Sequence, residues 1–239
     1  MRPVLYVIAL LCFSFAATGQ PYKYLVLKGG GIRGIAYIGA IKALEECKAA
    51  DKIEKVAGTS AGAITGTLFA FGYSAAEMER IMLGLNISTF NDGGWFFIGG
   101  QKRLRKNYGW YIGRKLEEWI EEKTSDKTGI AHITFLQLHH LVATGKKYKD
   151  LYITATNLTK QRPEVFSWET TPDLPVAAAV RASAAIPLYY GAVFMDSAGQ
   201  MTIHPDNDSR YNVYVDGGLL ANTVSTSISG MIFVINWYG

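Results

Sequence analysis

The sequence predicts an α/β fold with a mainly parallel central sheet and helices on both of its faces. Segments typical of strands alternate with segments typical of helices through the first half of the 239 residues. Three glycine-rich turns each follow a predicted strand, at residues 29–34, 58–62 and 216–218. Because sites in such sheets form at the carboxyl ends of strands, these turns are expected to carry the functional site.

The first half is expected to alternate between short apolar strands and amphipathic or apolar helices. These are strands at residues 22–27 and 53–57 and helices at residues 34–49, 61–71 and 74–83. The helix at 61–71 is apolar on all sides and must be buried. The helix at 74–83 begins with a capping box, in which Ser74 is the N-cap and Glu77 lies three residues later.

The second half begins with an irregular segment at 86–111 that is rich in glycine and aromatic residues. Beyond it, periodicity predicts helices at 112–123, 134–142 and 174–183 and strands at 151–157, 164–167 and 213–215. Pro187 forces an extended or turned segment after the helix at 174–183.

The first 19 residues have the layout of a secretory signal peptide. Arg2 precedes an apolar run at residues 4–15, and small residues follow, ending in Gly19. Cleavage after Gly19 leaves one domain at residues 20–239 and predicts an exported protein that is secreted, periplasmic or membrane-associated. The alternative is an uncleaved anchor, although the run is short compared with the roughly 20 residues of a membrane-spanning helix.

The net charge bears on the class of binding partner, and the cysteine content bears on disulfide bonds. The formal net charge of +4 permits attraction to anionic lipid surfaces and does not indicate a nucleic-acid partner. Cys12 belongs to the predicted signal, which leaves Cys47 without a disulfide partner in the mature chain. Cys47 continues the apolar pattern of Ile41 and Leu44, so it is expected to be a small buried side chain.

The turn Gly58-Thr59-Ser60-Ala61-Gly62 is typical of a serine nucleophile. Such a serine projects from a tight strand-to-helix turn that closes only when the residues two before and two after it are small, here Gly58 and Gly62. The start of the following helix stabilises developing negative charge. The alternative is a strand–turn–helix connection whose small residues serve only close packing.

The loop Gly29-Gly30-Gly31-Ile32-Arg33-Gly34 fits the pattern Gly-x-Gly-x-x-Gly. A dinucleotide-binding loop with this pattern needs an acidic residue about 20 positions later. The second strand ends instead in the serine turn, so a nucleotide-binding protein is the weaker alternative. The same loop can form an oxyanion hole from backbone N–H groups. Arg33 adds a positive charge nearby, unless it is simply a solvated residue.

The turn Asp216-Gly217-Gly218 supplies a carboxylate to act as base. An α/β-hydrolase triad places its histidine after the acid. None of the four histidines follows Asp216: they are His132, His139, His140 and His204. A triad through His204 and an earlier acid stays open, but the simpler hypothesis is a dyad in which Asp216 takes the proton of Ser60. Burial must then raise the pKa of Asp216 above its usual value of about 3.9.

Together the three turns resemble the patatin-like phospholipase family. Two further segments resemble it too, namely Arg181-Ala182-Ser183-Ala184-Ala185-Ile186-Pro187 and the strand pair at 154–157 and 165–167. The resemblance implies a three-layer α/β/α fold and a phospholipase A-type lipid acyl hydrolase that needs no metal or other cofactor. It maps Ser60 to the nucleophile and Asp216 to the base. It maps Gly29, Gly30 and Gly31 to the oxyanion hole, with Arg33 beside them.

The chain departs from the family pattern near its end. The family usually has a proline in Asn-x-Pro after the aspartate turn, whereas Asn222-Thr223 precedes Val224 here. The chain then ends quickly, at Gly239, so the domain is either naturally short or truncated. A catalytically impaired lipid-binding relative is therefore a second alternative.

The best candidate for contact with a lipid surface is the aromatic segment at residues 95–98. Four cations follow it, at Lys102, Arg103, Arg105 and Lys106. Aromatic side chains can enter the headgroup region while cations hold anionic lipid. The alternative is a loop whose aromatic residues pack into the core. The expected substrate is a phospholipid or another lipid ester, and the oligomeric state is left open.

Overall fold

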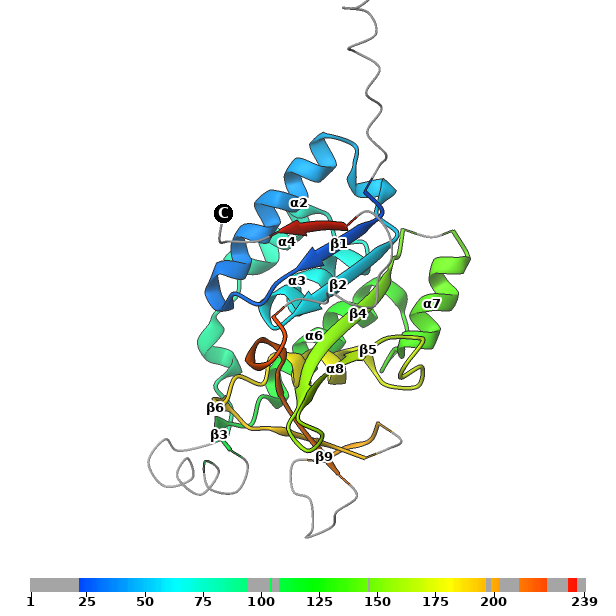
Figure 1. The fold of residues 1–239 in the computed structure, drawn as a ribbon. Helices are drawn as coiled ribbons and strands as arrows, with labels where there is room; N and C mark the ends of the chain where they lie inside the picture. Colours follow the sequence, from blue (N-terminus) through cyan, green and yellow to red (C-terminus); the bar gives the residue numbers. More distant parts are fainter. Residues whose placement is uncertain are drawn as a thin grey trace, which may run out of the picture.

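The protein is described by a computed structural model, and the α/β class is confirmed (Figure 1). The structure describes residues 22–93, 104, 108–145, 147–196, 199–202, 211–222 and 232–235, and all structural statements concern these residues. The predicted signal peptide lies outside them. Within them, strands and helices alternate through the first half as the sequence predicts.

The main sheet is mixed rather than parallel throughout. Its strand order is β10-β1-β2-β4-β9-β7-β8, with β5 paired to the second half of β4. The parallel part consists of β10 (Ile232–Ile235), β1 (Tyr24–Leu27), β2 (Lys55–Thr59) and β4 (Asp150–Asn157). The antiparallel part consists of β5 (Arg162–Phe166), β7 (Val193–Met195), β8 (Met201–Thr202) and β9 (Asn212–Asp216).

β4 joins the two parts of the sheet and changes partner along its length. Its first residues pair with β2 as far as Thr59 and Thr154, and its last residues pair with β9 from Ala155 and Asp216 onward. β2 therefore ends where β9 ends, although the two strands run in opposite directions. Two of the three glycine-rich turns follow parallel strands as expected, and the third reaches the same place from an antiparallel strand.

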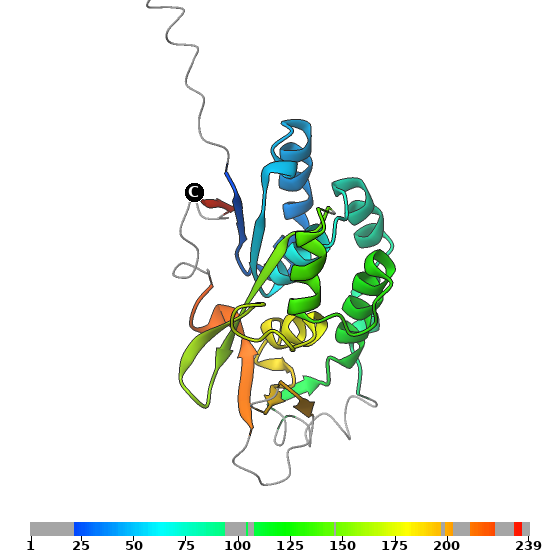
Figure 2. The same cartoon turned by 90° about the vertical axis from the view of Figure 1, so that its right-hand side faces the viewer.

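The described α-helices lie on one side of the sheet (Figure 2). They are α2 (Ala36–Glu46), α3 (Ala61–Ala70), α4 (Ala75–Leu83), α6 (Arg114–Thr128), α7 (Phe135–Ala143) and α8 (Val176–Ser183). The sequence predicted helices on both faces. The strand order explains the difference, because β1, β2 and β4 follow one another across the sheet without reversal. Right-handed crossovers between such strands all fall on the same face.

Helix α3 forms the centre of the helical layer. It is buried on nearly all sides, as its apolar sequence predicts. A Cβ at Gly66 would lie 3.1 Å from the side chain of Val56, so α3 packs closely on β2. This close packing fixes the start of α3, and with it the serine turn, relative to the sheet.

Local signals in the sequence located some elements better than others. The capping box of α4 is confirmed, with the N–H of Glu77 donating to Ser74 Oγ at 3.2 Å and the N–H of Ser74 to Glu77 Oε2 at 2.8 Å. The prediction that Cys47 is buried is wrong, because α2 ends at Glu46 and Cys47 lies exposed just beyond it.

Within the described part of the irregular segment lie two short elements, η3 (Ile87–Phe90) and β3 (Gly109–Tyr111). β3 pairs with β6 (Leu188–Tyr190), the extended segment that follows Pro187, in a separate two-stranded sheet. Three further short stretches of 3-10 helix occur among the described residues, namely η1 (Gly31–Ile35), η2 (Ala50–Lys52) and η4 (Gly217–Leu219). η1 and η4 follow β1 and β9, so each predicted glycine-rich turn opens a helical segment.

Candidate active site

Ser60 occupies the sharp turn between β2 and α3. Its backbone has φ 53° and ψ −122°, a conformation that costs a residue with a side chain roughly 1–3 kcal/mol. Crowding explains the glycines on either side. A Cβ on Gly58 would lie 2.5 Å from the carbonyl oxygen of Gly62, and one on Gly62 would lie 2.2 Å from that of Leu27. The turn therefore projects a serine hydroxyl from the strained backbone typical of a nucleophile.

The hydroxyl of Ser60 points at the carboxylate of Asp216. Ser60 Oγ donates a hydrogen bond to Asp216 Oδ2 at 2.5 Å, and both residues are buried, with 6% and 8% of their surface exposed. The other carboxylate oxygen, Oδ1, accepts a hydrogen bond from the N–H of Gly218 at 2.7 Å. The carboxylate is thus held in place by its own turn while it faces the serine.

Burial changes the acidity of Asp216. Removal from water raises the pKa of Asp216 above that of a free aspartate, and the hydrogen bonds from Ser60 and Gly218 act in the opposite direction. A Cβ on Gly217 would lie 2.3 Å from the carbonyl oxygen of Thr154, so only glycine lets the turn approach β4 this closely. The arrangement places a carboxylate of increased basicity where it can accept the proton of the serine hydroxyl.

Ser183, at the end of α8, connects the serine turn to β4 through two hydrogen bonds. Its Oγ accepts a hydrogen bond from the N–H of Ser60 at 2.9 Å and donates one to the carbonyl oxygen of Thr154 at 2.6 Å. Ser183 is completely buried. Sequence reasoning placed it in a family-like segment but assigned it no role. The available signal was a lone serine at the end of an alanine-rich helix whose only other polar residue is Arg181.

We expect Ser183→Ala to destabilise the fold and to lower kcat. The change leaves the N–H of Ser60 and the carbonyl of Thr154 buried without their present partner, at a cost of about 1–3 kcal/mol. Denaturant unfolding and ester-hydrolysis kinetics measure the two effects. Thr67→Ala is the matched control, since it removes a buried hydroxyl that bonds only within α3, to the carbonyl of Ala63. An equal loss of kcat in both variants would contradict a specific role for Ser183.

The loop after β1 lies against the serine turn. A Cβ on Gly34 would lie 2.7 Å from the Cβ of Ala61, so η1 packs directly on the start of α3. Gly31 has a φ of 54°, a value that favours glycine. Among the residues that the structure describes, the N–H groups of Gly30 and Gly31 have no hydrogen-bond acceptor. Both groups can therefore donate to a bound ligand.

Two residues that the sequence assigned to this oxyanion loop have other contacts. The N–H of Gly29 donates to Asn222 Oδ1 at 2.7 Å, so Gly29 does not present a donor to a ligand here. The N–H of Arg33 donates to the carbonyl of Gly30 at 3.2 Å, and Arg33 is exposed. The spacing of the glycines could not separate Gly29 from its neighbours, because the distinction depends on a residue 193 positions away.

A cavity of about 430 Å³ adjoins Ser60. Helices α3, α4 and α6 and the short elements η1, η3 and β6 contribute to its walls, as does Ala184 just after α8. The larger side chains that line it are Ile32, Ile35, Ile64, Met82, Leu85, Ile87, Phe90, Leu116, Trp119, Ile186, Tyr189 and Tyr190. A mostly apolar pocket beside a serine hydroxyl suits a ligand with a long apolar part and one reactive polar group.

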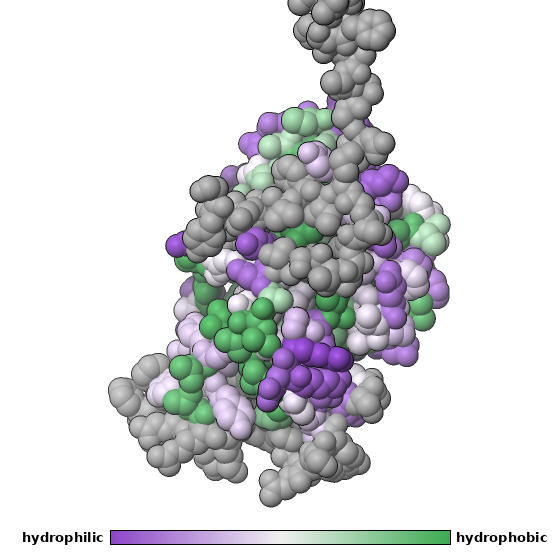
Figure 3. Space-filling view, in the orientation of Figure 1, coloured by the Kyte–Doolittle hydropathy of each residue, from purple (hydrophilic) through white to green (hydrophobic). Residues whose placement is uncertain are grey.

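Exposed apolar side chains surround this region of the molecule. Ile32 and Leu188 are 79% and 69% exposed, and Leu219 and Leu220, at the end of η4, are each more than half exposed. Figure 3 shows hydrophobic surface over η4 and again beside β6. Exposed apolar groups gathered in one region of a surface are typical of a site that contacts a protein partner or a membrane.

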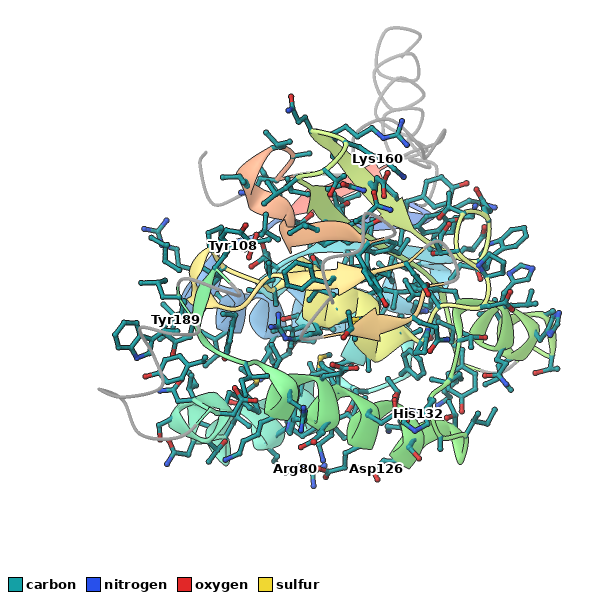
Figure 4. All side chains as sticks on the ribbon, turned by 90° about the horizontal axis from the view of Figure 1, so that it is seen from below. Arg80, Tyr108, Asp126, His132, Lys160 and Tyr189 are labelled. Carbon is teal, nitrogen blue, oxygen red and sulfur yellow. The ribbon has the colours of Figure 1, made fainter. Side chains whose placement is uncertain are left out.

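The described histidines lie away from the dyad. His139 Nδ1 lies 2.9 Å from Asp150 Oδ1, at the beginning of β4, and its ring stacks on Trp168 at 3.9 Å. His140 is on α7. His132 is exposed, and Figure 4 places it on the opposite side of the molecule from Tyr189, which lines the pocket. His204 lies outside the described residues, so the triad alternative is not addressed.

Several other predictions fall partly or wholly outside the described part of the chain. The proposed lipid-contact residues 95–98, with Lys102, Arg103, Arg105 and Lys106, are among them. Within the described part, no cluster of three histidine, cysteine, aspartate or glutamate residues is arranged to hold a metal ion. A search of the same residues finds no helix with the length and hydropathy that crossing a membrane requires.

Comparison with known proteins identifies relatives across most of the chain. A family model described as patatin-like phospholipase matches residues 25–225. An uncharacterized protein of Acanthamoeba polyphaga mimivirus is 35% identical over 166 residues, which cover 69% of this chain and 52% of that protein. A probable lipid hydrolase of Invertebrate iridescent virus 6 is 29% identical over 211 residues, covering 88% and 64%. The chain thus spans between half and two thirds of the length of these relatives.

Among solved structures, VipD from Legionella pneumophila has a similar fold. The TM-score is 0.62 at 22% sequence identity, and the match covers 90% of this chain and 49% of VipD. At this level of identity the likeness concerns the fold alone. The same α/β framework therefore occurs as one part of a larger protein.

Proposed function

Because the chain belongs to the patatin-like phospholipase family, we propose that it is a lipid acyl hydrolase of the phospholipase A type, with Ser60 as nucleophile and Asp216 as base. The observation that carries the proposal is the 2.5 Å hydrogen bond between Ser60 Oγ and Asp216 Oδ2 beside an apolar pocket. A lipid ester hydrolase needs these two features together, because the apolar acyl chain must lie where the ester carbonyl meets the serine.

In the proposed reaction, Asp216 accepts the proton of Ser60 while Ser60 Oγ attacks the ester carbonyl carbon. The N–H groups of Gly30 and Gly31 stabilise the oxyanion of the tetrahedral intermediate. The protonated Asp216 then gives its proton to the leaving alkoxide, and the acyl group remains on Ser60. A water molecule, activated by Asp216, hydrolyses this acyl-enzyme and restores both side chains.

The proposed position of the acyl chain is the apolar pocket. Each methylene group that leaves water for an apolar environment contributes about 0.8 kcal/mol, so the pocket can bind a fatty-acyl chain without specific polar contacts. The headgroup then lies on the open side, near η1 and the exposed Arg33. We further propose that the enzyme works at a lipid surface as a peripheral protein, which the exposed Ile32, Leu188 and Leu219 support.

The nucleotide-binding alternative has little support. Its glycine-rich loop lies against a serine turn, where η1 packs on the start of α3, and the family match covers both segments. A measurement of fatty-acid release distinguishes the catalytically impaired lipid-binding relative from an active hydrolase. The intact hydrogen bond between Ser60 and Asp216 is what a functional dyad requires.

Fatty-acid release from mixed phospholipid vesicles tests the proposed function. We expect release by the protein, and we expect a fluorophosphonate probe to stop it by labelling the peptide that contains Ser60. Ser60→Ala purified in the same way controls for contaminating lipases, because the probe would inhibit those enzymes too. Neither release nor labelling by a protein shown to be folded would favour the impaired relative. Labelling without release would point to an ester outside the phospholipids.

We also propose that the protein is exported through the signal peptide at residues 1–19. The support is the sequence pattern alone, a basic residue followed by an apolar run and small residues. Sequencing of the mature N-terminus after expression in a secreting host tests it, with Gln20 expected as the first residue. A mature chain that retains residues 1–19 would contradict cleavage.

A further inference from the structure

Asn222 forms a pair of hydrogen bonds with the backbone of Gly29. Its Oδ1 accepts from the N–H of Gly29 at 2.7 Å, and its Nδ2 donates to the carbonyl oxygen of Gly29 at 3.2 Å. A carboxamide carries one acceptor oxygen and an amino group with two donors, so it can satisfy both groups of one residue at once. Asn222 thereby clamps a residue 193 positions away in the chain.

The clamp needs glycine at its other end. A Cβ on Gly29 would lie 2.5 Å from Asn222 Oδ1 and 3.2 Å from the Cβ of Ser60. Gly29 is therefore enclosed between the carboxamide and the nucleophile. A movement of the Asn222 side chain would therefore change the position of Gly29 relative to Ser60.

The loop is held at a neighbouring point as well. The buried hydroxyl of Tyr37, on α2, donates to the carbonyl oxygen of Lys28 at 2.7 Å. Lys28 and Gly29 are thus fixed by two side chains from different parts of the fold. The next two N–H groups, of Gly30 and Gly31, are those left without an acceptor among the described residues.

Asn222 comes from the turn that also carries the base. The chain leaves Asp216 through η4, and the N–H of Ala221 donates to the carbonyl of Gly217 at 3.0 Å, which sets the direction of the following residue. Asp216 and Asn222 are therefore joined by one short segment, and its hydrogen bond limits how far apart the two side chains can lie. The base, the nucleophile and the oxyanion loop are connected through it.

We propose that Asn222 is a positioning residue, which holds the donors of Gly30 and Gly31 in register with the Ser60–Asp216 dyad. The inference rests on the proposed function. Asn222 contacts the loop and not the substrate, so its effect passes through the N–H groups that follow Gly29. Oxyanion donors act on the transition state more than on the bound ester, which separates their effect from that of the apolar pocket.

The variants Asn222→Ala and Asn222→Asp test the inference. Asn222→Ala removes both hydrogen bonds, and Asn222→Asp keeps the size of the side chain and the acceptor for the Gly29 N–H but removes the donor. We expect kcat to fall roughly 100-fold in Asn222→Ala, because a misplacement of about 1 Å costs a factor of that order, with a smaller change in KM. Asn222→Asp is expected to lie between Asn222→Ala and the natural protein.

Inhibitor binding distinguishes positioning from a general loss of structure. A long-chain trifluoromethyl ketone forms an oxyanion on Ser60, whereas the free fatty acid product occupies the apolar pocket without reacting. We expect Asn222→Ala to weaken the ketone by about the factor lost in kcat/KM and to leave the affinity for the fatty acid unchanged. Ala221→Ser is the control, since it alters the adjacent residue of the same turn and leaves the clamp intact.

The outcomes separate this inference from the proposed function. Parallel losses in kcat/KM and ketone affinity, with unchanged fatty-acid affinity and thermal midpoint, would support positioning by Asn222. A kcat within about threefold of the natural protein, or equal losses of ketone and fatty-acid affinity, would overturn it. A natural protein that releases no fatty acid from any lipid ester would instead overturn the proposed function itself.

Discussion

Ser60→Ala is expected to abolish fatty-acid release from phospholipid vesicles, with kcat reduced roughly 10⁴-fold or more. The change removes the only atom that can form the acyl-enzyme in the proposed reaction. It leaves the pocket and the oxyanion loop in place, so lipid binding should be retained. Release kinetics and vesicle binding, measured on the same preparation, check both expectations. Fluorophosphonate labelling should disappear with the activity.

Ser60→Gly provides a second test at the same position. The backbone of Ser60 has φ 53° and ψ −122°, which glycine adopts without the strain that a side chain suffers. Both variants lack the hydroxyl, but Ser60→Gly should be more stable than Ser60→Ala by about 1–3 kcal/mol. Denaturant unfolding of the two inactive proteins measures the difference. Equal stabilities would indicate that the turn relaxes when the hydroxyl is lost, and activity in either variant would remove Ser60 from the mechanism.

The parts of the site that lie close in sequence could be predicted. Small residues that follow apolar strands predict the turns around Ser60 and Gly31. Close packing and positive φ leave few alternatives to glycine at these positions. The capping box of α4 is readable for a similar reason, since Ser74 and Glu77 are three residues apart. In each case the physical cause and the sequence signal lie within one turn of the chain.

The contacts that complete the site join distant segments, and no local pattern predicts them. Ser183 bonds to the N–H of Ser60 across 123 positions, and Asn222 to Gly29 across 193. Asp92 accepts hydrogen bonds from the N–H groups of Gly113 and Lys115, at 2.6 and 3.0 Å, and so caps α6 from 21 positions away. α6 carries part of the pocket wall. Its position therefore depends on a residue in a segment that the sequence marks only as irregular.

The direction of β9 is a further feature that the sequence could not supply. The alternation of strands and helices predicts parallel strands, but β9 pairs antiparallel to both β4 and β7. Asp216 meets Ser60 because β4 pairs with β2 up to Thr154 and with β9 from Ala155. Strand order and register are set by tertiary packing, and hydropathy patterns alone leave both open.

Asp216→Asn is expected to lower kcat by roughly 10⁴-fold, since the amide cannot accept the proton of Ser60. The change keeps the size of the side chain and one oxygen for the N–H of Gly218. In the natural protein, hydrolysis requires ionised Asp216, so the rate should rise with pH through a pKa above that of a free aspartate. The pH dependence of kcat/KM, which reports groups of the free enzyme, is compared with that of Asp216→Asn and measures both effects. A rate that is independent of pH through the acid range would contradict Asp216 as the base.

The same variant should gain stability at neutral pH. Burial raises the pKa of Asp216 in the folded state above its value in the unfolded chain. A group of this kind contributes stability that is fully present below its unfolded pKa and is lost as the pH rises through its folded pKa. At neutral pH the natural protein therefore carries an ionised carboxylate that folding has partly removed from water, whereas the amide of the variant carries no charge.

We expect Asp216→Asn to unfold at higher denaturant concentration near pH 7, and the difference to shrink as the pH is lowered. A variant that is less stable at every pH would mean that the hydrogen bonds from Ser60 and Gly218 outweigh the cost of burying the charge. The expected result would identify Asp216 as a residue kept for its chemistry against the stability of the fold.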